Sequence, residues 1–305
     1  MRNGQVLLQA SIVLQLFGLG LRGLWSEVTR LPPAPTSISR MLAARDLLTP
    51  VVVMSVLSIL HVPRPAILGA TLVAISPGAL LISRGVLAPW FPSEIGLGVS
   101  AVATLSSIVT FQFWLPVVCW LFVSDASVAP AAVAQLVAVL FLLPLGVGAA
   151  VRRYEPALMK SVSGSVIVAS DLLLALALLP LLDGAVRVLP QLGVVFVFAA
   201  LCAPCIAVLA GILTRTSIGR KRSELAVVCS ARHPGFVLLI MGANFAGDVV
   251  MSAVVVSFIG GLAASTLYTF LTRHSRAAVL MAAEPVVAVM RDDRSVPAPP
   301  ASPST

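Results

Sequence analysis

Apolar residues occur along the chain in runs of about 20, separated by short polar or proline-rich links. A helix of about 20 apolar residues is long enough to cross the hydrocarbon core of a bilayer. The strands of a membrane barrel would instead alternate apolar and polar residues over about ten positions. The pattern therefore predicts nine transmembrane helices, at residues 5–25, 37–61, 64–84, 94–123, 128–151, 162–183, 188–214, 222–245 and 248–273.

The composition agrees with an all-α integral membrane protein. Of the 305 residues, 59% are hydrophobic and 10% are charged, and the mean hydropathy is +1.04. A soluble chain has no core large enough for so much apolar surface. We expect residues 1–290 to form one polytopic domain. We expect residues 291–305, which are rich in Asp, Pro, Ser and Ala, to be a disordered cytoplasmic tail.

The basic residues predict the orientation in the membrane. One side of the predicted topology receives most of them: Arg22, Arg30, Arg40, Arg84, Arg152, Arg153, Lys160, Arg215, Arg220, Lys221, Arg222, Arg273, Arg276, Arg291 and Arg294. The other side receives only Arg2, Arg64 and Arg187. Cytoplasmic loops carry the excess of Lys and Arg, so the N-terminus is predicted outside and the C-terminus in the cytoplasm. The net charge of +8 therefore gives no indication of nucleic-acid binding.

The Arg-rich, Ala-rich usage is typical of a GC-rich bacterial genome, which suggests an inner membrane.

Two of the predicted spans are interrupted by Pro-Gly. The third contains Ser76-Pro77-Gly78, and the eighth contains Ser230-Ala231-Arg232-His233-Pro234-Gly235. Proline lacks an N–H and disfavours helix in the residue before it, so each pair predicts a broken helix. The two spans are five apart, and an odd offset places them in opposite orientations. Paired broken helices of this kind are typical of inverted-repeat transporters.

The sequence resembles the bile acid:sodium symporter superfamily over most of its length. The likeness rests on five stretches: Leu16 to Leu21, Thr49 to Met54, Ser76 to Ser83, Gly96 to Ser107, and Arg232 to Gly235. The resemblance implies a panel domain and a core domain in which the two broken helices cross. It also implies secondary active transport of a small organic anion by alternating access.

The positions aligned with the sodium ligands of that family have changed. Sodium is a hard cation that requires carboxylate, amide and hydroxyl oxygens. The acidic position holds Val228, two glutamine positions hold Arg45 and Arg232, and the hydroxyl and amide positions hold Ile82, Ser83, Gly96 and Ser100. Sodium coupling at these sites is therefore not expected. The sequence does not decide whether the coupling ion is a proton or a sodium ion bound elsewhere. A proton-coupled exporter and a non-transporting receptor or scaffold remain alternatives.

The second break carries the candidate substrate chemistry. The guanidinium of Arg232 either occupies the place of a sodium ion by bonding freed carbonyls, or clamps an anionic substrate bidentately. The alternative is a buried ion pair with Asp46, or a carbonyl cap with no substrate role. His233 is a candidate proton relay, or an ordinary hydrogen-bonding group. The predicted substrate-binding residues are Ser76, Ser83, Ser230, Arg232 and His233.

The candidates for ion coupling are Arg45, Asp46, Ser100 and Asp171. Either aspartate could carry a proton if burial disfavours its charged form. The alternatives are that Arg45 and Asp46 lie near the membrane surface, with the helix starting after them, and that Asp171 faces a wet crevice.

Motifs of enzymes and metal sites are missing from the sequence. There is no nucleophile elbow, no H-E-x-x-H and no paired carboxylates. The cysteines lie in apolar runs without ligand spacing, and the histidines are scattered: Cys119, Cys202, Cys205, Cys229, His61, His233 and His274. We therefore predict neither an enzyme nor a bound cofactor or metal.

Overall fold

The computed structural model describes residues 2–23, 35–77, 94–122, 135, 138–213, 232–244 and 248–292. All regular structure in these ranges is helical, as the fold class predicts. Two of the elements, η1 and η3, are π-helical turns. The elements are α1 (Arg2–Arg22), α3 (Pro35–Ala43), η1 (Ala44–Leu48), α4 (Thr49–Ile59), α5 (Arg64–Ile75), α7 (Glu94–Phe122), η3 (Ala138–Leu142), α9 (Leu143–Tyr154), α10 (Pro156–Leu192), α11 (Val194–Leu213), α13 (Pro234–Asn244) and α14 (Asp248–Asp292).

Among the described residues, four helices are long and apolar enough to cross a membrane. They comprise Ile38–Ile59, Val102–Phe122, Pro156–Leu192 and Asp248–Tyr268. On α10, the side chains of Leu172, Leu176 and Leu179 are exposed. Residues at this spacing share one face of a helix, and an exposed leucine face is suited to contact with lipid. The described part is therefore that of an all-helical protein embedded in a membrane.

One predicted boundary is wrong, and one helix continues beyond its predicted span. The predicted link between residues 183 and 188 is part of α10, where Asp183 and Arg187 form an exposed ion pair of 2.9 Å one helical turn apart. The chain turns instead at Gly193, whose φ of 79° requires a residue without a Cβ. Helix α14 continues past residue 273 and includes Arg291 and Asp292, the first residues of the predicted tail. Residues 293–305 lie outside the described ranges.

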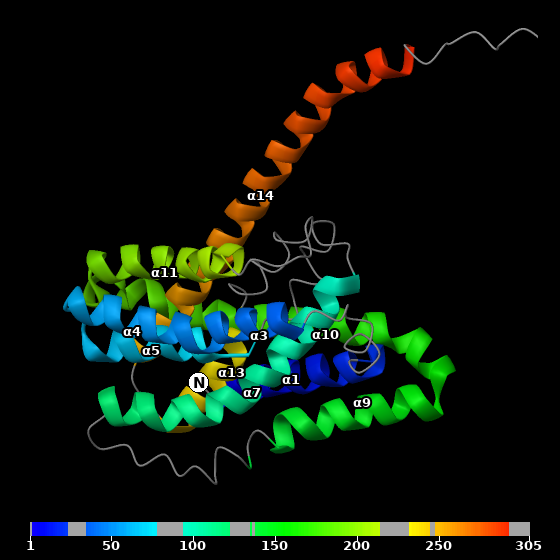
Figure 1. The fold of residues 1–305 in the computed structure, drawn as a ribbon. Helices are drawn as coiled ribbons and strands as arrows, with labels where there is room; N and C mark the ends of the chain where they lie inside the picture. Colours follow the sequence, from blue (N-terminus) through cyan, green and yellow to red (C-terminus); the bar gives the residue numbers. More distant parts are fainter. Residues whose placement is uncertain are drawn as a thin grey trace, which may run out of the picture.

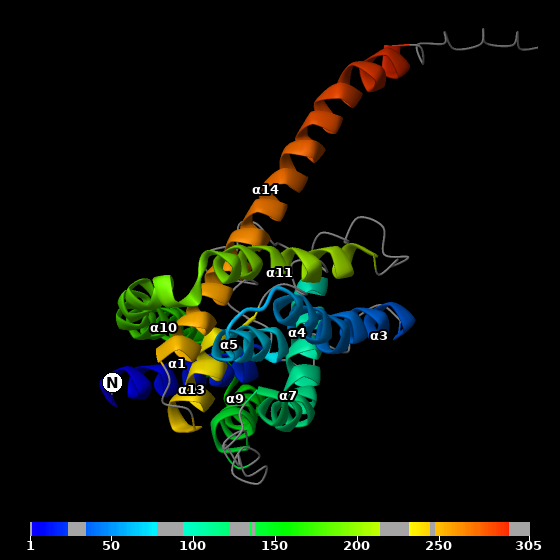
Figure 2. The ribbon, with the colours of Figure 1, turned by 90° about the vertical axis from the view of Figure 1, so that its left-hand side faces the viewer.

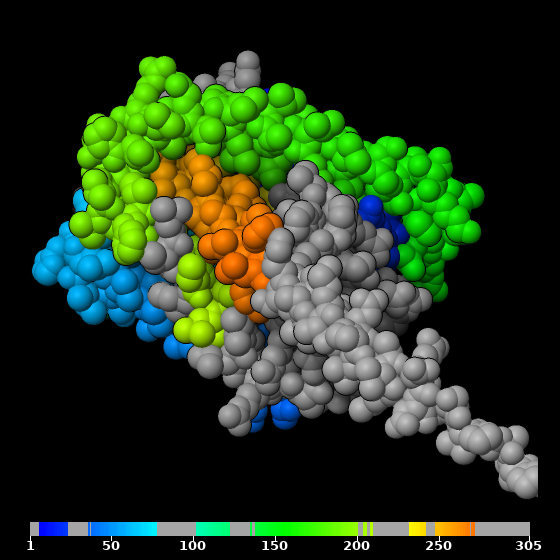
Figure 3. Space-filling view, turned by 90° about the horizontal axis from the view of Figure 1, so that it is seen from above, coloured from blue at the N-terminus to red at the C-terminus, as the bar shows by residue number. Residues whose placement is uncertain are grey.

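The long helix α14 begins within the bundle and then leaves it, as both ribbon views show (Figures 1 and 2). In the space-filling view its first part lies against α10 and α11 (Figure 3). Helices α1 and α9 approach so closely that a Cβ on Gly20 would lie 2.3 Å from the carbonyl oxygen of Leu145. Small residues at such interfaces let helix backbones touch.

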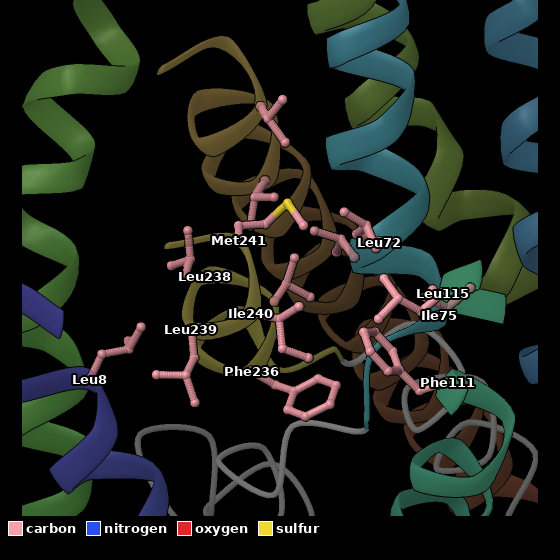
Figure 4. Packing of buried hydrophobic residues seen from close by; sticks show 14 of the residues in the cluster. Leu8, Leu72, Ile75, Phe111, Leu115, Phe236, Leu238, Leu239, Ile240 and Met241 are labelled. Atoms are coloured by element: carbon pink, nitrogen blue, oxygen red, sulfur yellow. The ribbon is translucent and has the colours of Figure 1, made fainter. Parts of the chain in front are cut away.

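Helix α13 lies at the centre of the hydrophobic core. Every residue from Pro234 to Met241 is buried, which is typical of a helix surrounded by others. Phe236 makes edge-to-face contacts with Phe111 and Phe141, at centroid distances of 4.5 and 4.6 Å. Figure 4 shows Phe236 beside Phe111, with leucine and isoleucine side chains of neighbouring helices around it. The start of α13, and with it the second Pro-Gly break, is therefore fixed inside the protein.

Candidate functional site

The two Pro-Gly segments are in direct contact. Helix α5 ends at Ile75, and Ser76 is extended. The backbone N–H of His233 donates to the carbonyl of Pro77 at 2.9 Å. The guanidinium of Arg232 donates from Nη1 to the carbonyl of Ser76 at 3.1 Å. The described parts of both breaks thus meet, although they are more than 150 residues apart in the sequence.

A π-helical turn supplies the third part of the site. Arg45 and Asp46 lie in η1, upstream of Pro50. Pro50 has no N–H, so it cannot bond the Asp46 carbonyl in an α pattern or the Arg45 carbonyl in a π pattern. Side chains bond both carbonyls instead: Arg232 Nη2 donates to that of Arg45 and Trp114 Nε1 to that of Asp46, each at 2.8 Å. Arg232 therefore joins the second break both to the first break and to η1.

The carboxylate of Asp46 lies among donors from two elements, η1 and α7. It accepts from Arg45 Nη1 at 2.8 Å, from the hydroxyl of Ser106 at 2.8 Å and from that of Ser107 at 3.0 Å. The nearest Arg232 nitrogen is 3.7 Å away. Two guanidiniums and one carboxylate give this cluster a net charge of +1. Charges interact strongly where water is excluded, and Arg45, Asp46 and Arg232 are only 0%, 2% and 6% exposed.

The guanidinium of Arg45 is bonded at one end only. Its Nη1 contacts the carboxylate of Asp46, the carbonyl of Ala103 at 2.8 Å and the hydroxyl of Ser107. Its Nε and Nη2 are buried and have no hydrogen-bond partner. A buried donor left without a partner costs about 1–3 kcal/mol, and more when it is charged. The other edge of Arg45 is therefore an unused site for an acceptor.

The alternative that the helix starts only after Arg45 and Asp46 is wrong. The helical run begins at Pro35, and both side chains are buried. They also pair with each other, although successive helical residues point about 100° apart. The pairing is possible because the arginine side chain is long enough to reach the carboxylate of the next residue.

Ser76 and His233 contact the opposite segment through backbone atoms, the carbonyl of Ser76 and the N–H of His233. The hydroxyl of Ser76 donates to the carbonyl of Val73 at 2.8 Å, so the group that meets Arg232 is the Ser76 carbonyl. The ring of His233 is hydrogen-bonded through Nε2 to Gln15 Oε1, whereas its Nδ1 is buried without a partner. A Cβ at Gly235 would lie 2.8 Å from the His233 ring, which explains the glycine there.

The remaining predicted residues do not join the cluster in the described structure. Gly78, Ser83 and Ser230 lie outside the described ranges, and only the backbone of Ser100 is described, in α7. Asp171 lies on α10, and its Oδ1 is buried without a hydrogen-bond partner. Within the described ranges no hydrogen bond or ion pair joins Asp171 to the three charged residues of the cluster.

Sequence reasoning missed two contributors, Gln15 and Trp114, and for two others, Ser106 and Ser107, it favoured a role in close helix packing over the lining of a polar cavity. Gln15 gave a signal, since it is a polar residue within a long apolar run. Trp114 lies in the middle of a predicted span, away from the interfaces where tryptophans serve as anchors. The two serines follow one another on α7, and nothing in their spacing distinguishes them from serines that allow close helix packing.

Searches of the sequence against protein-family models and against curated proteins found no match. The resemblance to the bile acid:sodium symporter superfamily therefore stays a prediction.

Proposed function

We propose that this protein is a secondary active transporter of a small organic anion, working by alternating access without sodium at the crossing. The observation that carries the proposal is the buried +1 cluster at the meeting point of the two breaks. Inverted-repeat transporters bind their substrates where such breaks meet near the bilayer midplane. The proposal takes the nine predicted spans and the inverted repeat as its architecture.

The polarity of the broken helices favours an anion as the cargo. Helix α13 begins at Pro234, beside the cluster, and a helix N-terminus carries partial positive charge. The cluster adds a net charge of +1 in a buried setting. A negatively charged substrate is favoured by both contributions, and a cationic substrate is disfavoured by both.

The carbonyl end of the first broken helix explains why sodium is not needed. A free helix C-terminus is where a coupling cation would bind in a broken-helix transporter. Here the guanidinium of Arg232 bonds the Ser76 carbonyl, and it also bonds the Arg45 carbonyl. In this proposal the guanidinium of Arg232, which is covalently attached, takes the role of the bound coupling cation.

Uptake into proteoliposomes tests the proposal. Purified full-length protein should concentrate at least one member of a panel of radiolabelled small carboxylates, above the level in empty liposomes. Arg232→Gln should slow that uptake, because an amide keeps a donor but loses the charge. Arg187→Gln, which changes an exposed arginine of α10, should leave it unchanged. Equal uptake by Arg232→Gln and wild type would remove Arg232 from the mechanism.

A non-transporting receptor or scaffold is the second candidate function. The observation in its favour is that Arg232 ties both breaks and η1 together in one buried network. A network of this kind stabilises one conformation, whereas transport requires two. The absence of uptake for the whole panel, in well-folded protein, would favour this candidate.

A further inference from the structure

We infer that the free edge of Arg45 is a binding site for a carboxylate, which it holds bidentately. That a carboxylate binds at this edge does not depend on the proposed function. That this carboxylate is the head group of a transported substrate rests on the proposed function. The argument starts from two atoms, Nε and Nη2 of Arg45, which are buried and have no partner in the described structure.

The two atoms have the geometry that a carboxylate requires. In a guanidinium, Nε and Nη2 lie on one edge and direct parallel N–H groups to the same side. This edge matches the two oxygens of a carboxylate, and the resulting pair of charge-assisted bonds is both strong and specific. A spherical ion or a single carbonyl would use only part of it. The planar, bidentate head group is therefore the ligand class that fits.

The surroundings hold this edge in place. Nη1, on the far side of the guanidinium, lies within hydrogen-bond distance of Asp46, of the carbonyl of Ala103 and of Ser107, which share its two N–H groups. With Nη1 held by α7 and η1, the edge formed by Nε and Nη2 points away from these partners. The Arg45 side chain is 0% exposed, so its orientation is set by packing and not by solvent. The site is preorganised, and binding requires little additional ordering.

The charge balance also favours an added anion. The carboxylate of Asp46 lies near both guanidiniums, 2.8 Å from Arg45 Nη1 and 3.7 Å from Arg232 Nη1. One bound carboxylate would bring the two guanidiniums and Asp46 to a net charge of zero. It would also satisfy the two orphaned donors. Arg232 contributes as the neighbouring positive charge, through its bond to the Arg45 carbonyl.

The test is isothermal titration calorimetry on the full-length protein in lipid nanodiscs, in zwitterionic buffer without other carboxylates. The probes are acetate, lactate and benzoate, the matched amides acetamide and benzamide, and chloride. We expect at least one carboxylate to bind, and its amide and chloride to bind at least about tenfold more weakly. No binding of any carboxylate would overturn the inference, as would equal binding of a carboxylate and its amide. If chloride bound with the same affinity as the carboxylate, the site would be one for a spherical anion, and the inference would again be overturned.

Variants then locate the site. Arg45→Lys keeps the charge but replaces the bidentate edge by a point donor, so carboxylate affinity should fall about tenfold or more. Arg187→Lys makes the same exchange on the surface and should bind as wild type does. Undiminished binding by Arg45→Lys overturns the inference. If that variant does not fold, the absence of a preference for carboxylates over amides on the wild type still overturns the inference.

The two proposals fail in different ways. Carboxylate binding that depends on Arg45, in a protein without uptake, would retain the site and reject the transport function. If the protein takes up carboxylates but Arg45→Lys binds them with unchanged affinity, the transport function is retained and this site is rejected.

Discussion

Asp46→Asn tests whether the buried charge network stabilises the protein. The substitution nearly preserves shape, so it creates little cavity, and it removes the one negative charge of the cluster. The carboxylate now accepts bonds from Arg45, Ser106 and Ser107 at 2.8 to 3.0 Å and lies 3.7 Å from Arg232. Without it, the buried guanidinium of Arg45 loses its ion pair.

The expected loss is large. Removing one partner of a buried ion pair typically costs about 3–5 kcal/mol, because the other charge remains in a low-dielectric interior. The matched control is Asp183→Asn, which removes the carboxylate of an ion pair whose side chains are 67% and 76% exposed. Exposed pairs one helical turn apart contribute only about 0.3–0.5 kcal/mol.

The assay is denaturant unfolding of the full-length protein in micelles, followed by tryptophan fluorescence. Asp46→Asn should lower the free energy of unfolding by about 3–5 kcal/mol at an unchanged denaturant slope, and Asp183→Asn by less than about 1 kcal/mol. The reasoning would be refuted if both variants lost a similar, small amount, since the Asp46 carboxylate would then not be paired in a dry interior.

Two further predictions concern the supports of the site. Gly148→Ala should lower the free energy of unfolding by about 1–3 kcal/mol, since its Cβ would lie 2.2 Å from the Phe17 carbonyl oxygen. Gly146→Ala, with nothing within 4 Å of its Cβ, is the control on the same helix, and equal losses in a thermal melt would contradict close packing of α1 and α9. Trp114→Phe keeps the aromatic ring but loses the bond from Nε1 to the Asp46 carbonyl, so it should cost about 1 kcal/mol in the same unfolding assay. A loss near zero would mean that the Asp46 carbonyl has another donor.

The helical fold, the end of α5 and the start of α13 could be predicted from the sequence because they depend on local chemistry. Apolar runs indicate helices, and Pro-Gly indicates where they stop. Helix α5 ends at Ile75 and helix α13 begins at Pro234, each at one of the two motifs. The boundary after α10 could not be predicted in this way, because Asp183 and Arg187 suggested a link but pair with each other on the helix.

The partners within the site depend on tertiary packing and were not predictable. Nothing local to Arg45 specifies that Ser107 and the Ala103 carbonyl of α7 bond its guanidinium. For Arg232 the sequence left bonds to carbonyls and an ion pair with Asp46 among several alternatives, beside the clamping of an anionic substrate. It did not indicate that Pro50 would free the Arg45 carbonyl for it, since that requires a π turn at η1.

The central claim is that an attached cation replaces sodium at the crossing of the two breaks. The most direct measurement is the initial rate of carboxylate uptake into proteoliposomes, with sodium and proton gradients imposed separately. We predict the same initial rate in sodium and in a sodium-free medium containing N-methylglucamine. If transport is coupled to protons, dissipating the pH gradient should abolish accumulation. Uptake that requires sodium would contradict the claim, since the Ser76 and Arg45 carbonyls would then have to bind an ion in the place of Arg232.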